Sequence, residues 1–340
     1  MFTMYRLILA VITLFNLSSI PCASAADYIQ YEDLFGRGVE FRPFSQPSYQ
    51  TQSAQTNYVY YLDQFTLHPH YFQAQHGKKR LIVLDNDGVL LSGSDDYSLA
   101  RAQRLLTALA ADRNNEVWVN SARSLSGLGE YRDIPWLNIA AEHGTVLLVT
   151  TPNGRKVTLT AQHHEAGSVR QAVKNEAGAV GMRLFEGQNS IAYAYKSPLS
   201  ESPVPAPHHL ISTEILPCLA GNDVKRMETR MQQYLASYYQ NWILRLEGDK
   251  NYGEFKHRYP DKGNFVIYLL RTGRYNVGLS MGDQESDEGM FKAMIQAQRE
   301  GLGTFYPVVV SSNTHQLTTA PHKLQNPDEV HQFFRTLGYA

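Results

Sequence analysis

The chain lacks a strong charge of either sign. Its 340 residues include 31 Lys and Arg and 32 Asp and Glu, which give a formal net charge of −1. Bulk charge therefore does not indicate a surface for polyanions, and no nucleic-acid partner is expected. Apolar runs long enough to span a bilayer are also missing beyond the N-terminus, so no stable membrane anchor is expected. A chain of this length is expected to hold one large domain with an insertion, or two domains.

The N-terminus has the composition of an export signal. Arg6 supplies a positive charge, and a mostly apolar run follows over residues 7–20. Ala23-Ser24-Ala25 then matches the small-x-small pattern, which predicts cleavage near Ala25 and a mature chain starting at Ala26. A membrane anchor is the alternative, but the run is short against the roughly 20 residues of a span. We therefore expect an exported protein, periplasmic or secreted.

Cysteine is scarce. Cys22 lies in the predicted signal, and Cys218 is the only other cysteine. Once the signal is removed, no disulfide can form within the chain, even in an oxidising compartment. Cys218 is expected to be a small core residue.

Strand-like and helical segments alternate over residues 80–150. An apolar run ends at Leu84, an amphipathic helix is predicted over 98–112, and strands are predicted at 117–119 and within 139–149. This order predicts an α/β fold with a Rossmann-like, doubly wound parallel sheet.

The pattern changes after residue 150. Residues 182–195 and 242–257 each indicate a β-hairpin, and helices are predicted over 167–176 and 223–239. This α+β block is predicted to be an inserted cap, after which the α/β pattern resumes near Lys262. The predicted division is a signal peptide (1–25), an N-terminal extension (26–79), a core (80–150 and 258–340) and a cap domain (151–257).

Asp85 and Asp87 follow the first apolar strand and lead into a turn at Gly88. Ligands in parallel α/β sheets bind beyond the carboxyl ends of the strands, so both acids can face one site. In such a pair, one carboxylate can attack phosphorus while the other protonates the leaving oxygen. A calcium-binding or merely turn-forming Asp-x-Asp-Gly is the alternative interpretation.

Ser121 and Lys262 occupy positions suited to an anion. Ser121 ends the next strand and offers a hydroxyl and backbone N–H groups to a phosphate, although a plain helix N-cap is the alternative. Lys262 precedes Gly263 at a predicted helix start, where the helix dipole disfavours a cation. That cost is understandable if the ammonium neutralises an aspartate and a phosphate; a solvated surface lysine is the alternative.

A second acidic cluster, residues 282–288, follows the apolar run 277–281. Asp283 is placed to bind a hard cation, and Asp287 follows one helical turn later. Magnesium prefers one or two carboxylates together with waters and substrate oxygens, so Mg²⁺ is the expected cofactor. An acidic helix N-terminus, favourable through the dipole alone, is the alternative.

The order of these motifs resembles that of the haloacid dehalogenase superfamily of aspartyl-phosphate hydrolases and, more narrowly, of trehalose-6-phosphate phosphatase. The second acid, Asp87, argues for the phosphatases of that superfamily rather than the dehalogenases. The resemblance covers roughly residues 80 to 340, and the matching blocks are DNDGVL (85–90), SAR (121–123), EHG (142–144), KG (262–263) and GDQESDEGMF (282–291).

The resemblance implies a haloacid dehalogenase-like core and a magnesium-dependent phosphoric monoester hydrolase for a small sugar phosphate, first of all trehalose 6-phosphate. A monomer is expected. By the same resemblance Asp85 is the nucleophile and Asp87 the acid/base, and Ser121 and Lys262 hold the phosphate. Asp85, Asp283 and the backbone carbonyl of Asp87 coordinate the magnesium.

The resemblance also implies that Asp287 supports the metal shell or Lys262. The expected substrate contacts are Arg123, Glu142, His143, Glu186 and Glu254. Where the family reads its sugar with Lys, His and Arg, this chain has Gln188, Ala194 and Lys196. Lys196 keeps the charge but loses the bidentate fork of arginine. The core therefore predicts phosphatase chemistry better than the cap predicts trehalose.

Two other interpretations stay open. The substrate can be another phosphosugar or a phosphotyrosyl peptide, read by the altered cap. Alternatively, the protein is an exported binding module with an inactive hydrolase core. Against this interpretation, the chain keeps four acidic and basic residues of the motifs: Asp85, Asp87, Lys262 and Asp283. Export also conflicts with the leading substrate, because trehalose 6-phosphate is normally a cytoplasmic intermediate.

Overall fold

The computed structural model describes residues 29–30, 60–61, 67–93, 95–161, 165–195, 219–246, 252–258, 261–313 and 315–339. The predicted signal peptide lies outside these residues, as do Cys22, Lys196 and Cys218.

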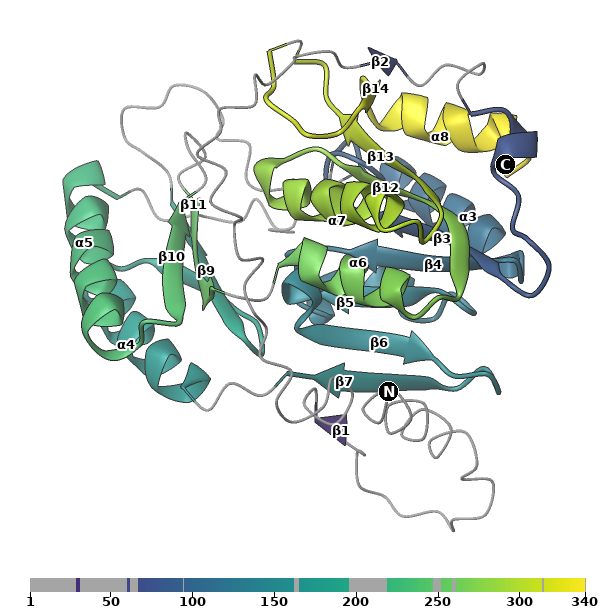
Figure 1. Ribbon diagram of the computed structural model, residues 1–340. Helices are drawn as coiled ribbons and strands as arrows, with labels where there is room; N and C mark the ends of the chain where they lie inside the picture. The colour runs from purple at the N-terminus through teal and green to yellow at the C-terminus, as the bar shows by residue number, and fades with distance from the viewer. Residues whose placement is uncertain are drawn as a thin grey trace.

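A ten-stranded sheet forms the larger part of the molecule (Figure 1). Its order is β1-β7-β6-β5-β4-β3-β12-β13-β14-β2, and all neighbours from β5 through β2 in that order are parallel. The predicted α/β class with a parallel sheet is thereby confirmed. The strands are β1 (Ile29–Gln30), β2 (Tyr60–Tyr61), β3 (Lys79–Leu84), β4 (Asn115–Asn120), β5 (Asn138–Ala141), β6 (Val146–Thr150), β7 (Lys156–Thr160), β12 (Tyr275–Gly282), β13 (Thr304–Val310) and β14 (His322–Leu324).

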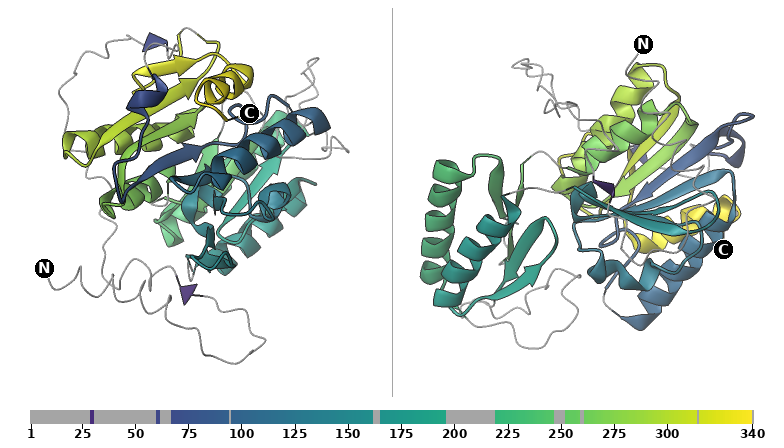
Figure 2. Two further views of the ribbon diagram at one scale, coloured as in Figure 1. Left: turned by 90° about the vertical axis from the view of Figure 1, so that its right-hand side faces the viewer. Right: turned by 90° about the horizontal axis from the view of Figure 1, so that it is seen from below.

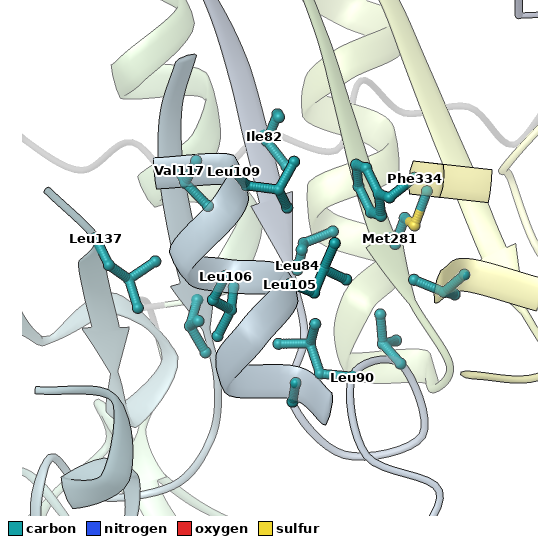
Figure 3. Packing of buried hydrophobic residues seen from close by; sticks show 14 of the residues in the cluster. Ile82, Leu84, Leu90, Leu105, Leu106, Leu109, Val117, Leu137, Met281 and Phe334 are labelled. Atoms are coloured by element: carbon teal, nitrogen blue, oxygen red, sulfur yellow. The ribbon is translucent and has the colours of Figure 1, made fainter. Parts of the chain in front are cut away.

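Helices cover both faces of this sheet. They are α3 (Asp96–Ala111), α6 (Lys262–Arg271), α7 (Glu288–Arg299) and α8 (Pro327–Thr336), with short 3-10 helices at η1 (Pro69–Tyr71), η2 (Ser126–Tyr131), η3 (Glu142–Gly144) and η5 (Glu285–Asp287). Side chains of strand β3 alternate between the faces. Ile82 and Leu84 pack with α3 and α8, as Figure 3 shows, whereas Leu81 and Val83 pack with α6 and α7. Each such buried side chain contributes about 1.5–3 kcal/mol to the stability of the fold. Because β3 is packed on both faces, the position of its carboxyl end is fixed.

Two neighbouring pairs of this mainly parallel sheet, β5–β6 and β6–β7, are antiparallel. Strands β5 and β6 are joined only by residues 142–145, and a parallel return needs a crossover of a dozen or more residues. Strand β6 therefore runs back beside β5, and β7 pairs antiparallel with β6. Strand β7 belongs to the large sheet, although its residues lie within the predicted cap range 151–257.

A second, antiparallel sheet has the order β10-β11-β9-β8. Its strands are β8 (Arg183–Glu186), β9 (Ser190–Ala194), β10 (Trp242–Leu246) and β11 (Tyr252–His257), and its helices are α4 (Ala166–Ala179) and α5 (Gly221–Tyr238). Ile191, Tyr193 and Phe255 form a core with residues of both helices. The helices lie on the side of this sheet that faces away from the large sheet (Figures 1 and 2). The other side of the small sheet therefore faces the large one; its standing as a separate domain stays a prediction.

The N-terminal extension contributes one short strand to each edge of the large sheet. Strand β1 pairs with β7 at one edge, and β2 pairs with β14 at the other. Across the described ranges, no helix is both long enough and apolar enough for a membrane crossing.

Candidate active site

The two acidic motifs meet because their strands are neighbours. Strands β3 and β12 are parallel and in register, with Leu84 opposite Met281. Asp85 follows the end of β3, and Asp283 follows the end of β12. A Cβ on Gly88 would overlap the carboxylate of Asp283, and the φ of 75° at Gly88 also favours glycine. The backbone of the first motif thus passes directly against the side chain of the second.

Lys262 is buried between two carboxylates. Its Nζ lies 2.9 Å from Oδ1 of Asp85 and donates to Oδ1 of Asp287 at 2.7 Å. With a side chain only 1% exposed, it is not a solvated surface lysine. Burial would lower the pKa of Lys262, but Asp287 and Asp85 raise it above its ordinary value, so the ammonium stays charged. Burial and the charge of Asp287 raise the pKa of Asp85 to about 8, against the lowering effect of Lys262.

Three carboxylates form a cluster that can hold a cation. One oxygen each of Asp85, Asp283 and Asp287 lies within 4.8 Å of the other two. Asp287 is already engaged by the protein, because its Oδ2 accepts from the backbone N–H groups of Asp283 and Gln284 at 3.0 Å. Hard divalent cations prefer carboxylate oxygens. The donor set therefore fits a divalent cation between Asp85 and Asp283, with Asp287 holding Lys262.

Asp87 forms a bidentate pair with Arg123. Nε and Nη2 of Arg123 donate to the two oxygens of Asp87 at 2.8 and 2.5 Å, and Nη1 donates to the carbonyl of Gly127 at 3.2 Å. Arg123, predicted to contact substrate, is placed by these bonds beside the predicted acid/base. The planar fork fixes the carboxylate as an ammonium would not.

Ser121 lies beside the start of α6. Asn120, the last residue of β4, donates through Nδ2 to the carbonyl of Lys262 at 3.2 Å. Ser121 is buried, and its Oγ accepts from the N–H of Arg123 at 3.2 Å. Asn120 thus links the loop that contains Ser121 to the start of the helix that contains Lys262. This role was not predicted from the sequence. The feature that could have indicated it is a polar residue at the end of an apolar strand.

Glu142, His143 and Glu254 lie where the two sheets meet. Glu142 accepts hydrogen bonds from the backbone N–H groups of Gln188 and Asn189 in the β8–β9 turn. Nε2 of His143 lies 2.8 Å from Oε2 of Glu254 on β11. Three of the residues predicted to contact substrate therefore contact each other or the small sheet.

Glu186 is placed away from this group. Its exposed carboxylate lies 2.8 Å from Nζ of Lys174 on α4, on the helix side of the small sheet. Of the two altered sugar-reading positions within the described ranges, Gln188 accepts from the hydroxyl of Thr160 at 2.9 Å and Ala194 is buried.

Comparisons with known proteins point to one family. A family model described as trehalose-phosphatase matches residues 83–177, from β3 into α4. A trehalose-phosphatase of Schizosaccharomyces pombe is 25% identical over 231 residues, which cover 65% of this chain and 24% of that protein. The chain thus spans about a quarter of the length of this curated relative.

Solved structures share the fold. The trehalose-6-phosphate phosphatase of Aspergillus fumigatus is 20% identical, with a TM-score of 0.54 over 83% of this chain and 100% of that chain. The C-terminal domain of the C. albicans trehalose-6-phosphate phosphatase is 18% identical, with a TM-score of 0.59 over 83% of this chain and 98% of that one.

The predicted export is contradicted by these comparisons. The relatives are trehalose phosphatases, and the substrate of such enzymes is normally a cytoplasmic intermediate. The prediction rested on the composition of the first 25 residues alone, and a short apolar run with small residues after it is a pattern of low specificity.

The predicted enzyme class, a phosphatase similar to trehalose phosphatases, agrees with the family model and the curated relative. The resemblance seen in the motifs is confirmed: this chain is similar to trehalose-6-phosphate phosphatases in its family-model match, its curated relative and its fold.

Proposed function

We propose that this chain is a magnesium-dependent phosphatase that hydrolyses a sugar phosphate through an aspartyl-phosphate on Asp85. One observation carries the proposal. Lys262 reaches Asp85 and Asp287 from the start of α6, next to Asp283 at the end of β12. Residues almost 200 positions apart thus form one buried site beyond the ends of two parallel strands, where ligands bind in sheets of this type.

The reaction has two displacements at phosphorus. A carboxylate oxygen of Asp85 attacks the phosphate, the bond between phosphorus and the sugar oxygen breaks, and Asp87 gives a proton to the leaving oxygen. Asp87 then accepts a proton from water as that water attacks the acyl phosphate, which releases phosphate and restores Asp85.

Each remaining residue of the site has a proposed part. Lys262 and Ser121 hold the phosphate oxygens, and Arg123 orients Asp87 through its bidentate contact. Asp85, Asp283 and the carbonyl of Asp87 would hold Mg²⁺, with Asp287 behind them. Bound magnesium supplies positive charge for the phosphate oxygens and favours the ionised form of Asp85.

Trehalose 6-phosphate is the leading substrate, on the strength of the family match and the curated relative. The small sheet favours a second candidate, another phosphosugar. Gln188 is bound to Thr160, and Ala194 offers only a methyl group, so neither supplies a cation for sugar hydroxyls.

Replacement of the nucleophile tests the mechanism. Asp85→Asn keeps the size of the side chain but removes the attacking charge, and we expect phosphate release to fall by at least about 10³-fold. Circular dichroism should show an unchanged fold. Asp328→Asn, which alters an exposed aspartate on α8, should keep full activity. Turnover retained in Asp85→Asn would reject the covalent mechanism.

A panel of phosphate esters tests the substrate. Trehalose 6-phosphate, other phosphosugars and a phosphotyrosyl peptide would be compared by kcat/KM with magnesium present. Preference for trehalose 6-phosphate supports the leading substrate, and preference for another phosphosugar supports the second. Absence of magnesium-dependent hydrolysis throughout would reject the proposed function.

A further inference from the structure

The turn after β5 has an unusual backbone. Glu142, His143 and Gly144 have φ values of 49°, 58° and 89° in succession. For residues other than glycine the left-handed region is costly, and three left-handed residues in a row persist only where the surroundings hold them. The non-glycine residues Glu142 and His143 therefore occupy this turn at a cost in backbone strain. A role for their side chains would explain why they are there.

The backbone of this turn is fastened to the loop after β4. The N–H of Glu142 donates to the carbonyl of Arg123 at 2.9 Å, and the N–H of His143 donates to the carbonyl of Ser121 at 3.0 Å. Ser121 and Arg123 are the residues beside Lys262 and Asp87. A displacement of the turn would therefore displace the loop that faces the phosphate.

The carboxylate of Glu142 holds the turn between β8 and β9. It accepts from the N–H groups of Gln188 at 2.8 Å and Asn189 at 2.7 Å. A Cβ on Gly187 would overlap this carboxylate. Nη2 of Arg170 donates to the carbonyls of Gly187 and Gln188 from the opposite side. The contact is buried and charge-assisted, which makes it stronger than a neutral hydrogen bond.

His143 makes the second contact to the small sheet. Its Nε2 lies 2.8 Å from Oε2 of Glu254, and both side chains are buried. Glu142 thus binds the β8–β9 turn while His143 binds β11. Adjacent residues of the turn after β5 therefore hold a turn and a strand of the small sheet.

We propose that Glu142 and His143 are positioning residues that form a clasp, defined as these two side chains with the N–H groups of 188 and 189 and the carboxylate of Glu254. The clasp holds the small sheet against the Ser121–Arg123 loop. A sugar phosphate that touches both sheets depends on the clasp for alignment, whereas a small aryl phosphate depends mainly on the large sheet. This consequence rests on the proposed function; the clasp itself does not.

Hydrogen exchange tests the clasp independently of catalysis. In Glu142→Gln the amides of 188 and 189 lose a carboxylate acceptor, and we expect their exchange to accelerate by roughly tenfold or more. Glu329→Gln is the matched control, because Glu329 also accepts a backbone N–H, that of Gln325, but on α8. Unchanged exchange at 188 and 189 in Glu142→Gln would overturn the clasp.

Selectivity between two phosphate esters tests whether the clasp positions the substrate during turnover. The ratio of kcat/KM for the preferred phosphosugar to that for p-nitrophenyl phosphate should fall about tenfold in Glu142→Gln and in His143→Leu. His143→Gln, which keeps an N–H donor toward Glu254, should retain most of the ratio. Equal losses in His143→Leu and His143→Gln, or an unchanged ratio in Glu142→Gln, would overturn the positioning role. A wild-type protein inactive on both esters would reject the proposed function, while the exchange experiment would still decide the clasp.

Discussion

Gly263 allows α6 to approach α7 closely at the point where Lys262 enters the site. A Cβ at this position would overlap the backbone carbonyl of Gly289 on α7. Gly263→Ala should therefore push the helices apart and cost about 1–3 kcal/mol of unfolding free energy. Because Lys262 is the preceding residue, phosphate release should fall as well. Urea denaturation followed by circular dichroism, with a phosphate assay, measures both effects.

Gly167 supplies the matched control. It also lies in a helix, α4, but nothing lies within 4 Å of the position its Cβ would take. Gly167→Ala should stabilise the protein by about 0.5–1 kcal/mol through reduced backbone freedom. If Gly263→Ala were as stable as Gly167→Ala, the close helix crossing would be disproved.

His143 makes stability depend on pH. Burial lowers its pKa to about 4, against the raising effect of Glu254, from an ordinary value of 6.5. Between pH 6.5 and 4 the unfolded chain binds a proton that the folded chain does not. Stability should therefore decline as the pH falls through this window, by up to about 3 kcal/mol. Urea midpoints at pH 7 and 4.5 should differ less in His143→Gln than in the wild type; an equal decline in both would contradict the assignment.

Helix α6 begins with a side-chain cap that also places Lys262. Asp261 accepts from the N–H of Asn264 at 2.7 Å, and Lys262 is the first helical residue. Asp261→Ala should cost about 1 kcal/mol of unfolding free energy, as lost N-caps do. It should also lower kcat, because the first turn of α6 aims the ammonium at Asp85.

Asn326 caps α8 in the same way, by accepting from the N–H of Glu329 at 3.0 Å. Asn326→Ala should lose a similar amount of stability while kcat stays at the wild-type value. The pair of variants separates a loss of stability from a loss of positioning. Equal kcat values in the two variants would show that the α6 cap does not position Lys262.

The acids of the site were predictable because their placement is local. Asp85 and Asp283 each follow an apolar run, and parallel strands deliver such residues to one edge of a sheet. Lys262 was assigned to the site by the resemblance, since the unfavourable helix dipole at its position left a solvated surface lysine as an alternative. The α/β class followed from the alternation of apolar strands and amphipathic helices in the same way.

Partners across the chain were not predictable from these patterns. The bidentate contact of Arg123 with Asp87 depends on how two loops meet, and the contact of His143 with Glu254 depends on how a turn of the large sheet meets strand β11. The position of Glu186, away from the other predicted substrate contacts, has a different reason. In a strand a shift of one residue moves a side chain to the opposite face, and Glu186 lies on the helix side. Strand β7 was placed in the cap range because a strand's own sequence does not show which sheet it pairs with.

Across the molecule as a whole, the fold brings negative charges together beyond the ends of β3 and β12. Asp85 and Asp287 pair with the ammonium of Lys262, and Asp283 lies in the same carboxylate cluster. When all of these groups are ionised, the cluster carries more negative than positive charge. Burial and Asp287 accordingly raise the pKa of Asp85 to about 8. Without a bound cation this group favours the folded state below its unfolded pKa, and that contribution is lost as the pH rises through 8. A bound divalent cation should offset this loss of folding stability at high pH.

Magnesium binding should therefore release a proton from Asp85 in a pH-dependent way. With a pKa of about 8, roughly 0.9 of a proton should leave at pH 7 and roughly 0.1 at pH 9. Calorimetric titrations of the metal-free protein in buffers of different ionisation enthalpy measure this number directly. Asp287→Asn removes the negative charge that raises the pKa of Asp85 most, so this pKa should fall and the release at pH 7 should decrease. If the wild type released the same number of protons at both pH values, the cation would not bind at Asp85.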